Sequence, residues 1–264
     1  MIKIVVCIFY IVTLINIVTF ANYRIKNGGK AKLIVERPVR NGEKMTYCLP
    51  GLKSNAASAF RFLDQAFVQD TTLRKSGFTY IKYENTGFDV RTIANQIVDD
   101  IKTHNYQPVI ISVSVGDQIA RLVEREIKGV PIIAINPATN DECLDFWVQT
   151  KMRIKLFFEN FGITSIGWFG LLPICQTDGK PKQSLVLVND MKNSLIKSRL
   201  EVKQSNTKAV FFSYFDKLLD NAAIYDIFGL TDAEAILVDT EHANLALGGI
   251  LYRDDLIRVL KTIY

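Results

Sequence analysis

Ser114 and the residues around it carry the strongest chemical signal in the chain. The pentapeptide Ser112-Val113-Ser114-Val115-Gly116 lies between an apolar run that predicts a buried strand and an amphipathic stretch that predicts a helix. A serine at such a junction can present its hydroxyl group as a nucleophile, and small residues two positions away on either side let strand and helix approach each other. Such chemistry requires a general base and an acid elsewhere in the chain.

The general base of a serine nucleophile has to titrate near neutral pH, and histidine is the usual choice. The chain holds two histidines, His104 and His242. His104 ends a predicted helix, where a cation in solvent interacts favourably with the helix dipole. His242 follows the last predicted strand, at the sheet edge where Ser114 is expected to project. We therefore expect His242 to be the base.

The acid should accept a hydrogen bond from the imidazole and hold its tautomer. Asp216 directly follows a predicted strand over residues 208–214, so it should emerge at the carboxyl end of that strand. Asp220 is the alternative, one turn later, and Asp239 ranks below both. Each of the three carboxylates could instead cap a helix or lie in a solvated loop.

Cysteine is the competing nucleophile. Cys7 lies in the apolar N-terminal stretch, Cys48 in a predicted strand, and Cys143 and Cys175 in an irregular region, so none occupies a strand–helix junction. Cys143 and Cys175 could form a disulfide if the domain is exported. Cysteine and histidine are not closely spaced anywhere in the chain, and we expect neither a metal site nor a cofactor.

Alternating strands and helices from Pro50 onward predict a parallel sheet with helices on both faces. The predicted strands cover residues 31–39, 44–49, 78–83, 108–113, 131–135, 208–214 and 234–239. The predicted helices are centred on residues 57–67, 90–101, 119–127, 222–228 and 253–263. Asn-Gly turns beside the first two strands predict a hairpin. The alternation stops over about residues 140–206, which predicts an insertion.

From about Ala31 to its end, the chain resembles an α/β-hydrolase. Leu49-Pro50-Gly51-Leu52 resembles the His-Gly segment that supplies one oxyanion N–H group, and residues 112–116 resemble the nucleophile elbow. Ser213-Tyr214-Phe215-Asp216 resembles the Gly-x-x-Asp of the acid, and Glu241-His242 resembles the Gly-His of the base. The chain order serine, aspartate, histidine is the order of this family.

The resemblance implies an α/β-hydrolase fold with a mostly parallel central sheet, helices on both faces, and a lid insertion between strands 6 and 7. It implies cleavage of a carboxylic ester through an acyl-enzyme, with Ser114 as nucleophile, His242 as base and Asp216 as acid. The main-chain N–H groups of Leu52 and Val115 would form the oxyanion hole, and Val115 lies at a predicted helix N-terminus that favours negative charge.

Departures from the family pattern leave other functions open. Pro50 replaces the usual histidine, while Ser112, Ser213 and Glu241 replace usual glycines. The same triad could serve an acyltransferase, a thioesterase or a peptidase, because the fold does not choose among them. A non-catalytic binding module is the alternative outside enzymes.

The N-terminus predicts contact with a membrane or a secretory route. Residues 4–20 are apolar and uncharged, and as a helix they would span about 25 Å. We therefore divide the chain into an anchor or signal segment, residues 1–22, and a hydrolase domain, residues 23–264. Cleavage after Thr19-Phe20-Ala21 would give a secreted protein, and retention would give a membrane-associated one. A buried first strand is a third interpretation.

Composition and the insertion indicate the kind of substrate. The net charge of +5 comes without a long basic run, so we do not expect nucleic acid as a partner, and we predict no protein partner. The insertion concentrates aromatic residues with the cations Lys151, Arg153 and Lys155. Its rings either pack the insertion onto the core or form an apolar acyl pocket, with the cations facing anionic lipid headgroups. The expected substrate is a small-molecule or lipid ester.

Overall fold

The computed structural model describes most of the domain. The described residues are 33–39, 42–51, 56–83, 88–160, 185–198, 200, 202, 205–228, 233–241 and 252–264, with the isolated residues 4, 7, 10, 11, 14 and 18. The predictions for Leu52, Cys175 and His242 therefore lie outside the described residues, as does most of the apolar N-terminal stretch. Among the helices that are described, none combines the length and the apolar character needed to span a membrane.

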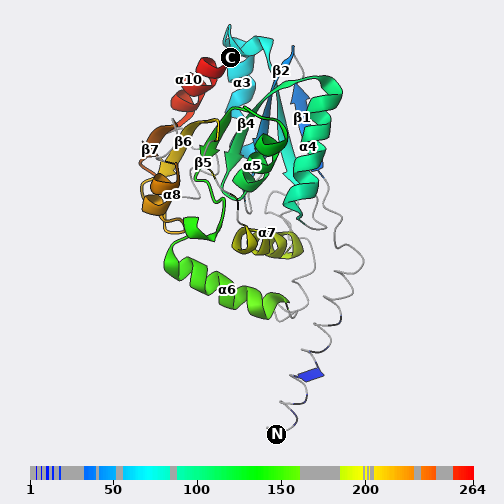
Figure 1. Cartoon of the computed structure of the whole chain (residues 1–264), viewed down its shortest axis with the longest axis vertical. Coiled ribbons are helices and arrows are strands. Elements are labelled where there is room, and N and C mark those ends of the chain that lie inside the picture. Colours follow the sequence, from blue (N-terminus) through cyan, green and yellow to red (C-terminus); the bar gives the residue numbers. More distant parts are fainter. Residues whose placement is uncertain are drawn as a thin grey trace.

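A single sheet organises the described chain, with the strand order β1-β3-β2-β4-β5-β6-β7 (Figure 1). The strands are β1 (Leu33–Val39), β2 (Lys44–Leu49), β3 (Gly77–Tyr83), β4 (Gln107–Val113), β5 (Ile132–Ile135), β6 (Thr207–Ser213) and β7 (Glu234–Val238). All neighbouring pairs from β3 to β7 are parallel, whereas β1 pairs antiparallel with β3 at one edge. The predicted mostly parallel sheet is confirmed.

Helices cover both faces of this sheet. They are α2 (Ala56–Ala59), α3 (Phe62–Gln69), α4 (Val90–His104), α5 (Gly116–Glu126), α6 (Phe146–Asn160), α7 (Leu185–Lys197), α8 (Asn221–Phe228) and α10 (Arg253–Ile263), with short 3₁₀ turns η1 (Leu73–Lys75) and η2 (Asp141–Cys143). Residues of α3 and α10 pack with Ile111 of β4, and residues of α4 and α5 pack with Ile110. Successive strand residues point to opposite faces, so one apolar run fills two cores.

The predicted hairpin between the first two strands is wrong. β3 lies between β1 and β2, pairing antiparallel with the first and parallel with the second. The physical reason is the burial of β2, whose residues Met45 to Leu49 are all buried. A strand covered on both faces needs a neighbour on each side as well, and β3 and β4 supply them.

The described part of the insertion holds the helices α6 and α7, which the sequence analysis did not predict. Five strands precede it, so it lies between β5 and β6 of the described sheet and not between strands 6 and 7 as expected. Helix α6 escaped prediction because apolar side chains occur on opposite sides of it: Leu156 is buried, whereas Phe146 and Trp147 are exposed. No single apolar stripe therefore marks the helix. Figure 1 shows α6 and α7 together at one end of the sheet.

Candidate active site

Ser114 occupies a sharp turn between β4 and α5. Its φ of 50° places a non-glycine residue in the left-handed region, one residue after β4 ends and two before α5 begins. That conformation is strained for an L-residue and often marks a functional site. The turn has the strand–turn–helix geometry predicted for the nucleophile, and the catalytic role of Ser114 stays a prediction.

Backbone hydrogen bonds hold the turn rigidly against the end of β5. The N–H of Ser114 donates to the carbonyl of Ile135 at 2.9 Å. The carbonyl of Ser114 accepts from the N–H groups of Asp117, at 3.0 Å, and Ala138, at 3.1 Å. These three hydrogen bonds hold Ser114 in place, so the surrounding structure can maintain its positive φ.

The loop after β2 lies directly against this turn. A Cβ atom built on Gly51 would stand 2.8 Å from the Cβ atom of Ser114, and one built on Gly116 would stand 2.9 Å from the carbonyl oxygen of Pro50. Both positions therefore require glycine for close approach. The buried hydroxyl of Tyr83 donates to the same Pro50 carbonyl at 2.9 Å, and burial raises the pKa of Tyr83. The loop that leads into Leu52 is thus fixed beside the proposed nucleophile.

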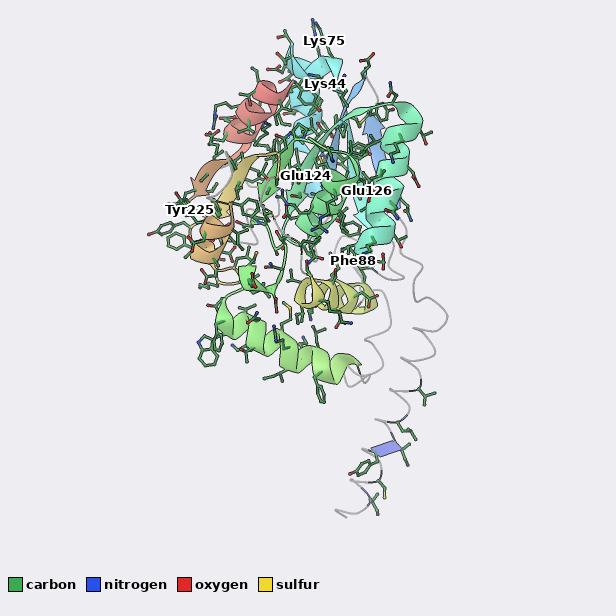
Figure 2. The ribbon with its side chains drawn as sticks, in the orientation of Figure 1. Lys44, Lys75, Phe88, Glu124, Glu126 and Tyr225 are labelled. Carbon is green, nitrogen blue, oxygen red and sulfur yellow. The ribbon has the colours of Figure 1, made fainter. Side chains whose placement is uncertain are left out.

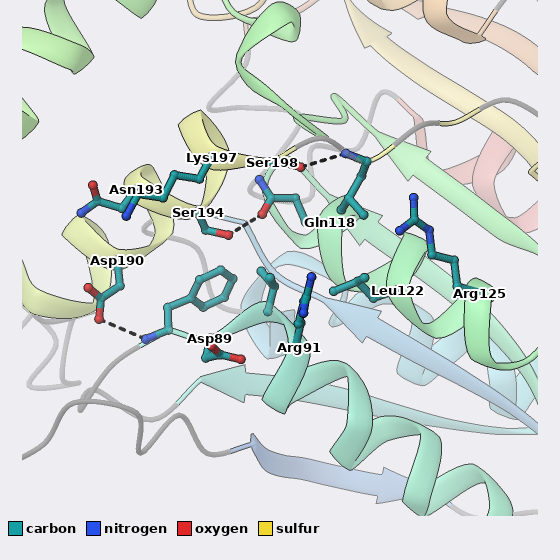
Figure 3. Close-up of a pocket in the computed structure, with 13 residues that line it drawn as sticks. Asp89, Arg91, Gln118, Leu122, Arg125, Asp190, Asn193, Ser194, Lys197 and Ser198 are labelled. Carbon is teal, nitrogen blue, oxygen red and sulfur yellow. Dashed lines mark hydrogen bonds between the residues drawn. The ribbon is translucent and has the colours of Figure 1, made fainter.

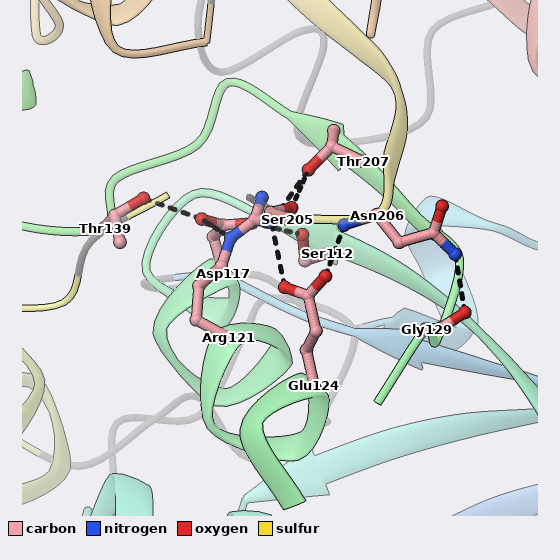
Figure 4. A network of polar contacts seen from close by, with 9 residues as sticks. All are labelled: Ser112, Asp117, Arg121, Glu124, Gly129, Thr139, Ser205, Asn206 and Thr207. Carbon is pink, nitrogen blue, oxygen red and sulfur yellow. Dashed lines mark hydrogen bonds and ion pairs between the residues drawn. The ribbon is translucent and has the colours of Figure 1, made fainter. Parts of the chain in front are cut away.

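A buried ion pair lies beneath the turn, on the first two turns of α5 (Figure 4). Asp117 and Arg121 are both almost wholly inaccessible to solvent, and Arg121 donates from Nη2 to Asp117 Oδ1 at 3.0 Å and from Nε to Oδ2 at 3.1 Å. Asp117 also accepts from Ser112 Oγ, at 2.9 Å, and from Thr139 Oγ1, at 2.6 Å. The serine that replaces the first glycine of the family pattern therefore has a defined hydrogen-bond partner.

Arg121 extends this network to the strand on the other side of β5. Its Nη1 donates to Thr207 Oγ1 at 2.8 Å and lies 3.5 Å from Glu124 Oε2. Nη1 also contacts Ser205, and Glu124 accepts from the backbone N–H of Asn206. The network ties the helix that begins beside Ser114 to the start of β6. The sequence analysis missed it, although the i, i+4 spacing of Asp117 and Arg121 suits an ion pair within a helix.

The two candidate acids make the same kind of backbone contact and differ in burial. Asp216 is half-buried three residues beyond β6, and its Oδ1 accepts from the N–H groups of Leu218, at 2.8 Å, and Leu219, at 2.9 Å. Asp220 is exposed, and its Oδ1 accepts from the first N–H groups of α8, at 3.0 and 3.1 Å, which is the role of an N-cap. The third candidate, Asp239, is exposed after β7. These surroundings favour Asp216.

Asn136 joins the ends of β5 and β6 beside the acid loop. It has a φ of 43°, its Nδ2 donates to Ser213 Oγ at 2.6 Å, and its Oδ1 accepts from the N–H of Ser213 at 2.8 Å. Ser213 replaces a family glycine three residues before Asp216, and its hydroxyl is satisfied within the core. The sequence analysis did not identify Asn136; asparagine directly after a buried strand was the available signal, because asparagine tolerates the left-handed region.

The loops after β6 and β7 run side by side. The N–H of Tyr214 donates to the carbonyl of Val238 at 2.8 Å, and the N–H of Phe215 donates to the carbonyl of Thr240 at 3.0 Å. Phe215 precedes Asp216, and Thr240 precedes His242 by two residues. These bonds bring together the segments that carry the proposed acid and lead to the proposed base.

His104 occupies the opposite end of the sheet. It ends α4 and precedes β4, whereas Ser114 follows β4, so about 20 Å of strand separates the two positions. Its exposed ring lies 3.2 Å from Asp100 Oδ1 and stacks on Tyr106 with centroids 5.2 Å apart. The predicted solvated role at the helix end is confirmed.

Two of the described cysteines, Cys48 and Cys143, are buried and poorly suited to act as nucleophiles. Cys7, Cys48 and Cys143 are free, and Cys175, the proposed partner of Cys143, lies outside the described residues. Burial raises the pKa of Cys48, and it raises the pKa of Cys143 to about 11. A thiol that does not ionise near neutral pH is a poor nucleophile. In the described part of the chain, no group of acidic, histidine or cysteine side chains could hold a metal ion.

A polar cavity of about 820 Å³ lies between α4, α5 and α7 (Figure 3). Its lining includes Arg91, Arg125, Lys197 and Gln118, but not Ser114 or Asp216. The Oγ atom of Ser194 on α7 donates to Gln118 Oε1 on α5 at 2.7 Å, which connects the insertion to the helix that follows the nucleophile turn. The described lining of the cavity therefore includes neither the proposed nucleophile nor the proposed acid.

Solved structures share the fold of this chain, although no family model and no curated protein matches the sequence. An E-2-(acetamidomethylene)succinate hydrolase aligns with a TM-score of 0.58 and 14% identity over 89% of this chain and 95% of its own. A carboxylesterase of the thaumarchaeon Nitrososphaera gargenis aligns with a TM-score of 0.59 and 13% identity over 88% of this chain and 95% of its own. A monoacylglycerol lipase of Paleococcus ferrophilus aligns with a TM-score of 0.57 and 11% identity over 88% and 98%.

These structures and the strand–turn–helix at Ser114 define the fold class. The chain has the α/β-hydrolase fold, as the resemblance of its motifs implied. At this level of sequence identity, the likeness establishes the fold, and the activity has to be argued from the site.

Proposed function

We propose that the protein is a serine hydrolase that cleaves carboxylic esters. The observation that carries the proposal is the left-handed backbone of Ser114 at the end of β4, with Gly51 pressed against it. The turn lies at the carboxyl edge of the parallel strands, where ligands bind in open α/β sheets. Among the structural neighbours are carboxylesterases and a monoacylglycerol lipase, which supports an ester as substrate.

In the proposed reaction, Ser114 Oγ attacks the ester carbonyl while His242 takes the hydroxyl proton. The main-chain N–H groups of Val115 and Leu52 stabilise the oxyanion, and the first N–H groups of α5 add a favourable helix dipole. His242 then protonates the departing alkoxide, which leaves as the alcohol. Water, deprotonated by His242, attacks the acyl carbon, and the bond from this carbon to Ser114 Oγ breaks as His242 returns the proton to Oγ. The carboxylic acid leaves, and the free enzyme is restored. Asp216 accepts a hydrogen bond from His242 and keeps its tautomer fixed.

The contact between the β6 and β7 loops supports the pairing of Asp216 with His242. Ser114 and Asp216 follow strands separated by one strand, which corresponds to about 10 Å across the sheet. An imidazole ring with a hydrogen bond on each side fits within such a gap. The hydrogen bond from Phe215 to Thr240 brings the segment leading to His242 to the side of the acid loop.

A fluorophosphonate probe tests the nucleophile. We expect the probe to label the wild-type protein and Ser114→Ala to abolish labelling. The matched control is Ser112→Ala, which removes a hydroxyl group that lies two residues away and donates to Asp117. The Ser112→Ala protein should still be labelled. Labelling that survives Ser114→Ala would exclude Ser114. Absence of labelling in the folded wild-type protein would instead favour a non-catalytic binding module.

The acyl group of the substrate is tested separately. We propose an apolar acyl pocket formed between the sheet edge and the insertion. The protein should therefore hydrolyse p-nitrophenyl octanoate with a higher kcat/KM than p-nitrophenyl acetate. Each buried methylene group contributes about 0.8 kcal/mol, which favours the longer chain. Equal kcat/KM for the two esters would contradict the apolar pocket while leaving the nucleophile assignment intact.

A further inference from the structure

Helix α6 presents an apolar surface to solvent. Phe146 and Trp147 are each 66% exposed, Ile154 is 57% exposed and Phe157 is 61% exposed. At about 100° of rotation per residue, these four side chains fall within an arc of about 100° on one side of the helix. We call this set the α6 apolar face. A contiguous exposed group of large apolar side chains on a soluble domain marks an interaction surface.

The opposite side of α6 is held firmly to the domain, so the apolar face is presented in a fixed direction. Leu156 is buried, and Met152 packs against the cluster that contains Phe212 of β6. Asp145 caps the helix by accepting from the N–H groups of Trp147, at 2.9 Å, and Val148, at 3.2 Å. At the margin of the apolar face, Arg153 forms an additional ion pair with the buried Asp141 of η2. The helix therefore does not need to turn its apolar face inward to be stable.

Cations border the α6 apolar face. Lys151 and Lys155 are exposed, and the helical rotation places them about 40° and 80° beyond Trp147. Arg153 lies on the other border, about 20° beyond Phe146. A helix with Trp and Phe on one side and lysine along its margin matches the boundary between lipid headgroups and acyl chains. A protein partner fits less well, because lysine is depleted in protein–protein interfaces.

We propose that α6 docks on an anionic lipid surface, with the α6 apolar face immersed at the headgroup boundary and Lys151 and Lys155 in contact with anionic headgroups. The inference goes beyond the proposed ester hydrolysis, because the docking involves none of the triad residues. The sequence predicted that the rings of the insertion pack onto the core or line an acyl pocket. In this proposal, the exposed rings of Phe146, Trp147 and Phe157 instead contact lipid.

Tryptophan fluorescence tests the docking directly. The chain contains two tryptophans, so Trp168→Phe leaves Trp147 on the α6 apolar face as the only reporter. The full-length chain also carries Ser114→Ala, so that no lipid is hydrolysed and the result does not depend on the proposed activity. Vesicles of phosphatidylcholine and phosphatidylglycerol with brominated acyl chains should quench Trp147. The same vesicles without bromine should shift its emission to shorter wavelength.

Quenching also separates docking by α6 from attachment through the apolar N-terminal stretch. A chain that sediments with the vesicles while Trp147 is not quenched would overturn the proposal. A blue shift that depends on protein concentration in the absence of vesicles would also overturn it, because a second copy of the chain would then cover α6.

Matched variants test the two components of the surface. Lys151→Gln/Lys155→Gln should weaken binding to anionic vesicles about 30-fold, and Lys102→Gln/Lys128→Gln, which removes the same charge at other exposed positions, should change it little. Phe146→Ser/Ile154→Ser should reduce quenching of Trp147. Its control is Val68→Ser/Tyr225→Ser, at exposed apolar residues of α3 and α8; Figure 2 labels Tyr225 on α8, away from α6. Equal losses from the paired variants, with unchanged thermal unfolding, would exclude α6 as the docking surface.

Discussion

The backbone N–H of Phe215 donates a hydrogen bond of 3.0 Å to the carbonyl oxygen of Thr240. One partner adjoins Asp216, and the other precedes His242 by two residues. The bond fixes the loop after β6 to the loop after β7 at the carboxyl edge of the sheet. The proposed acid is therefore attached to the segment that leads to the proposed base.

This relationship predicts different consequences for two neighbouring aspartates. Asp216→Asn should lower kcat for a p-nitrophenyl ester by about 10³- to 10⁴-fold, because the amide no longer holds the reactive tautomer of His242. Asp220→Asn should leave kcat within about twofold, because Asp220 caps α8 and asparagine is an equally good N-cap. Steady-state kinetics of the two variants decide between them, and the reverse pattern would assign the acid to Asp220.

Gly51 should tolerate no side chain without loss of activity. Gly51→Ala would place a methyl group 2.8 Å from the Cβ atom of Ser114, so the loop or the nucleophile turn has to move. We expect kcat to fall by about 100-fold, as misplacement of a reacting group by about 1 Å does. The control is Gly129→Ala, where the φ of 80° is strained but nothing lies within 4 Å. It should lower stability by about 1 kcal/mol and leave kcat unchanged, as urea unfolding and kinetics would show.

The buried ion pair of α5 should make a large contribution to stability that depends on both partners being present. Arg121→Leu leaves the carboxylate of Asp117 buried without its counter-ion and should lower the free energy of unfolding by about 3–5 kcal/mol. The same change at Arg258, whose ion pair with Glu234 is exposed, should cost less than about 1 kcal/mol. Urea unfolding measures both, and equal losses at the two sites would contradict the argument.

Buried thiol and phenol groups predict a loss of stability at alkaline pH. Burial raises the pKa of Cys143 to about 11, so the folded state holds this proton after the unfolded chain has released it. The stabilising contribution is complete below pH 9 and is lost as pH rises from about 9 to 11, by roughly 2–3 kcal/mol. Cys143→Ala should make the decrease in unfolding free energy over this interval less steep. An unchanged slope in urea unfolding at pH 8, 9.5 and 10.5 would contradict the assignment.

Patterns that depend only on neighbouring residues in the sequence, such as an apolar run, helical spacing or a helix cap, predicted the described elements well. The apolar run of β4 and the spacing along α4 were confirmed, and Asp89 caps α4 by accepting from Thr92 at 2.7 Å. The hairpin failed because Asn-Gly signals a turn but not which strands become neighbours. That choice depended on the burial of β2 between β3 and β4.

The candidate site was predictable in part. The turn at Ser114 followed from its place between a strand and a helix, whereas the residues that support it are joined by contacts distant in sequence. Asp117 meets Thr139, and Asn136 meets Ser213, 77 positions later. A sequence shows each of these polar residues but not its partner. The placement of His242 and Leu52 remains a prediction.

The bond from Ser112 to Asp117 has a consequence for how this fold is recognised from a sequence. A search pattern that demands glycine two positions before the nucleophile would reject this chain, although the backbone turn is formed. Where a hydroxyl at that position reaches a buried carboxylate at the start of the following helix, serine is structurally acceptable in place of glycine. Ser-x-Ser-x-Gly-Asp is therefore a second sequence pattern that can form this turn. Other chains that carry the pattern should be tested for the same fold.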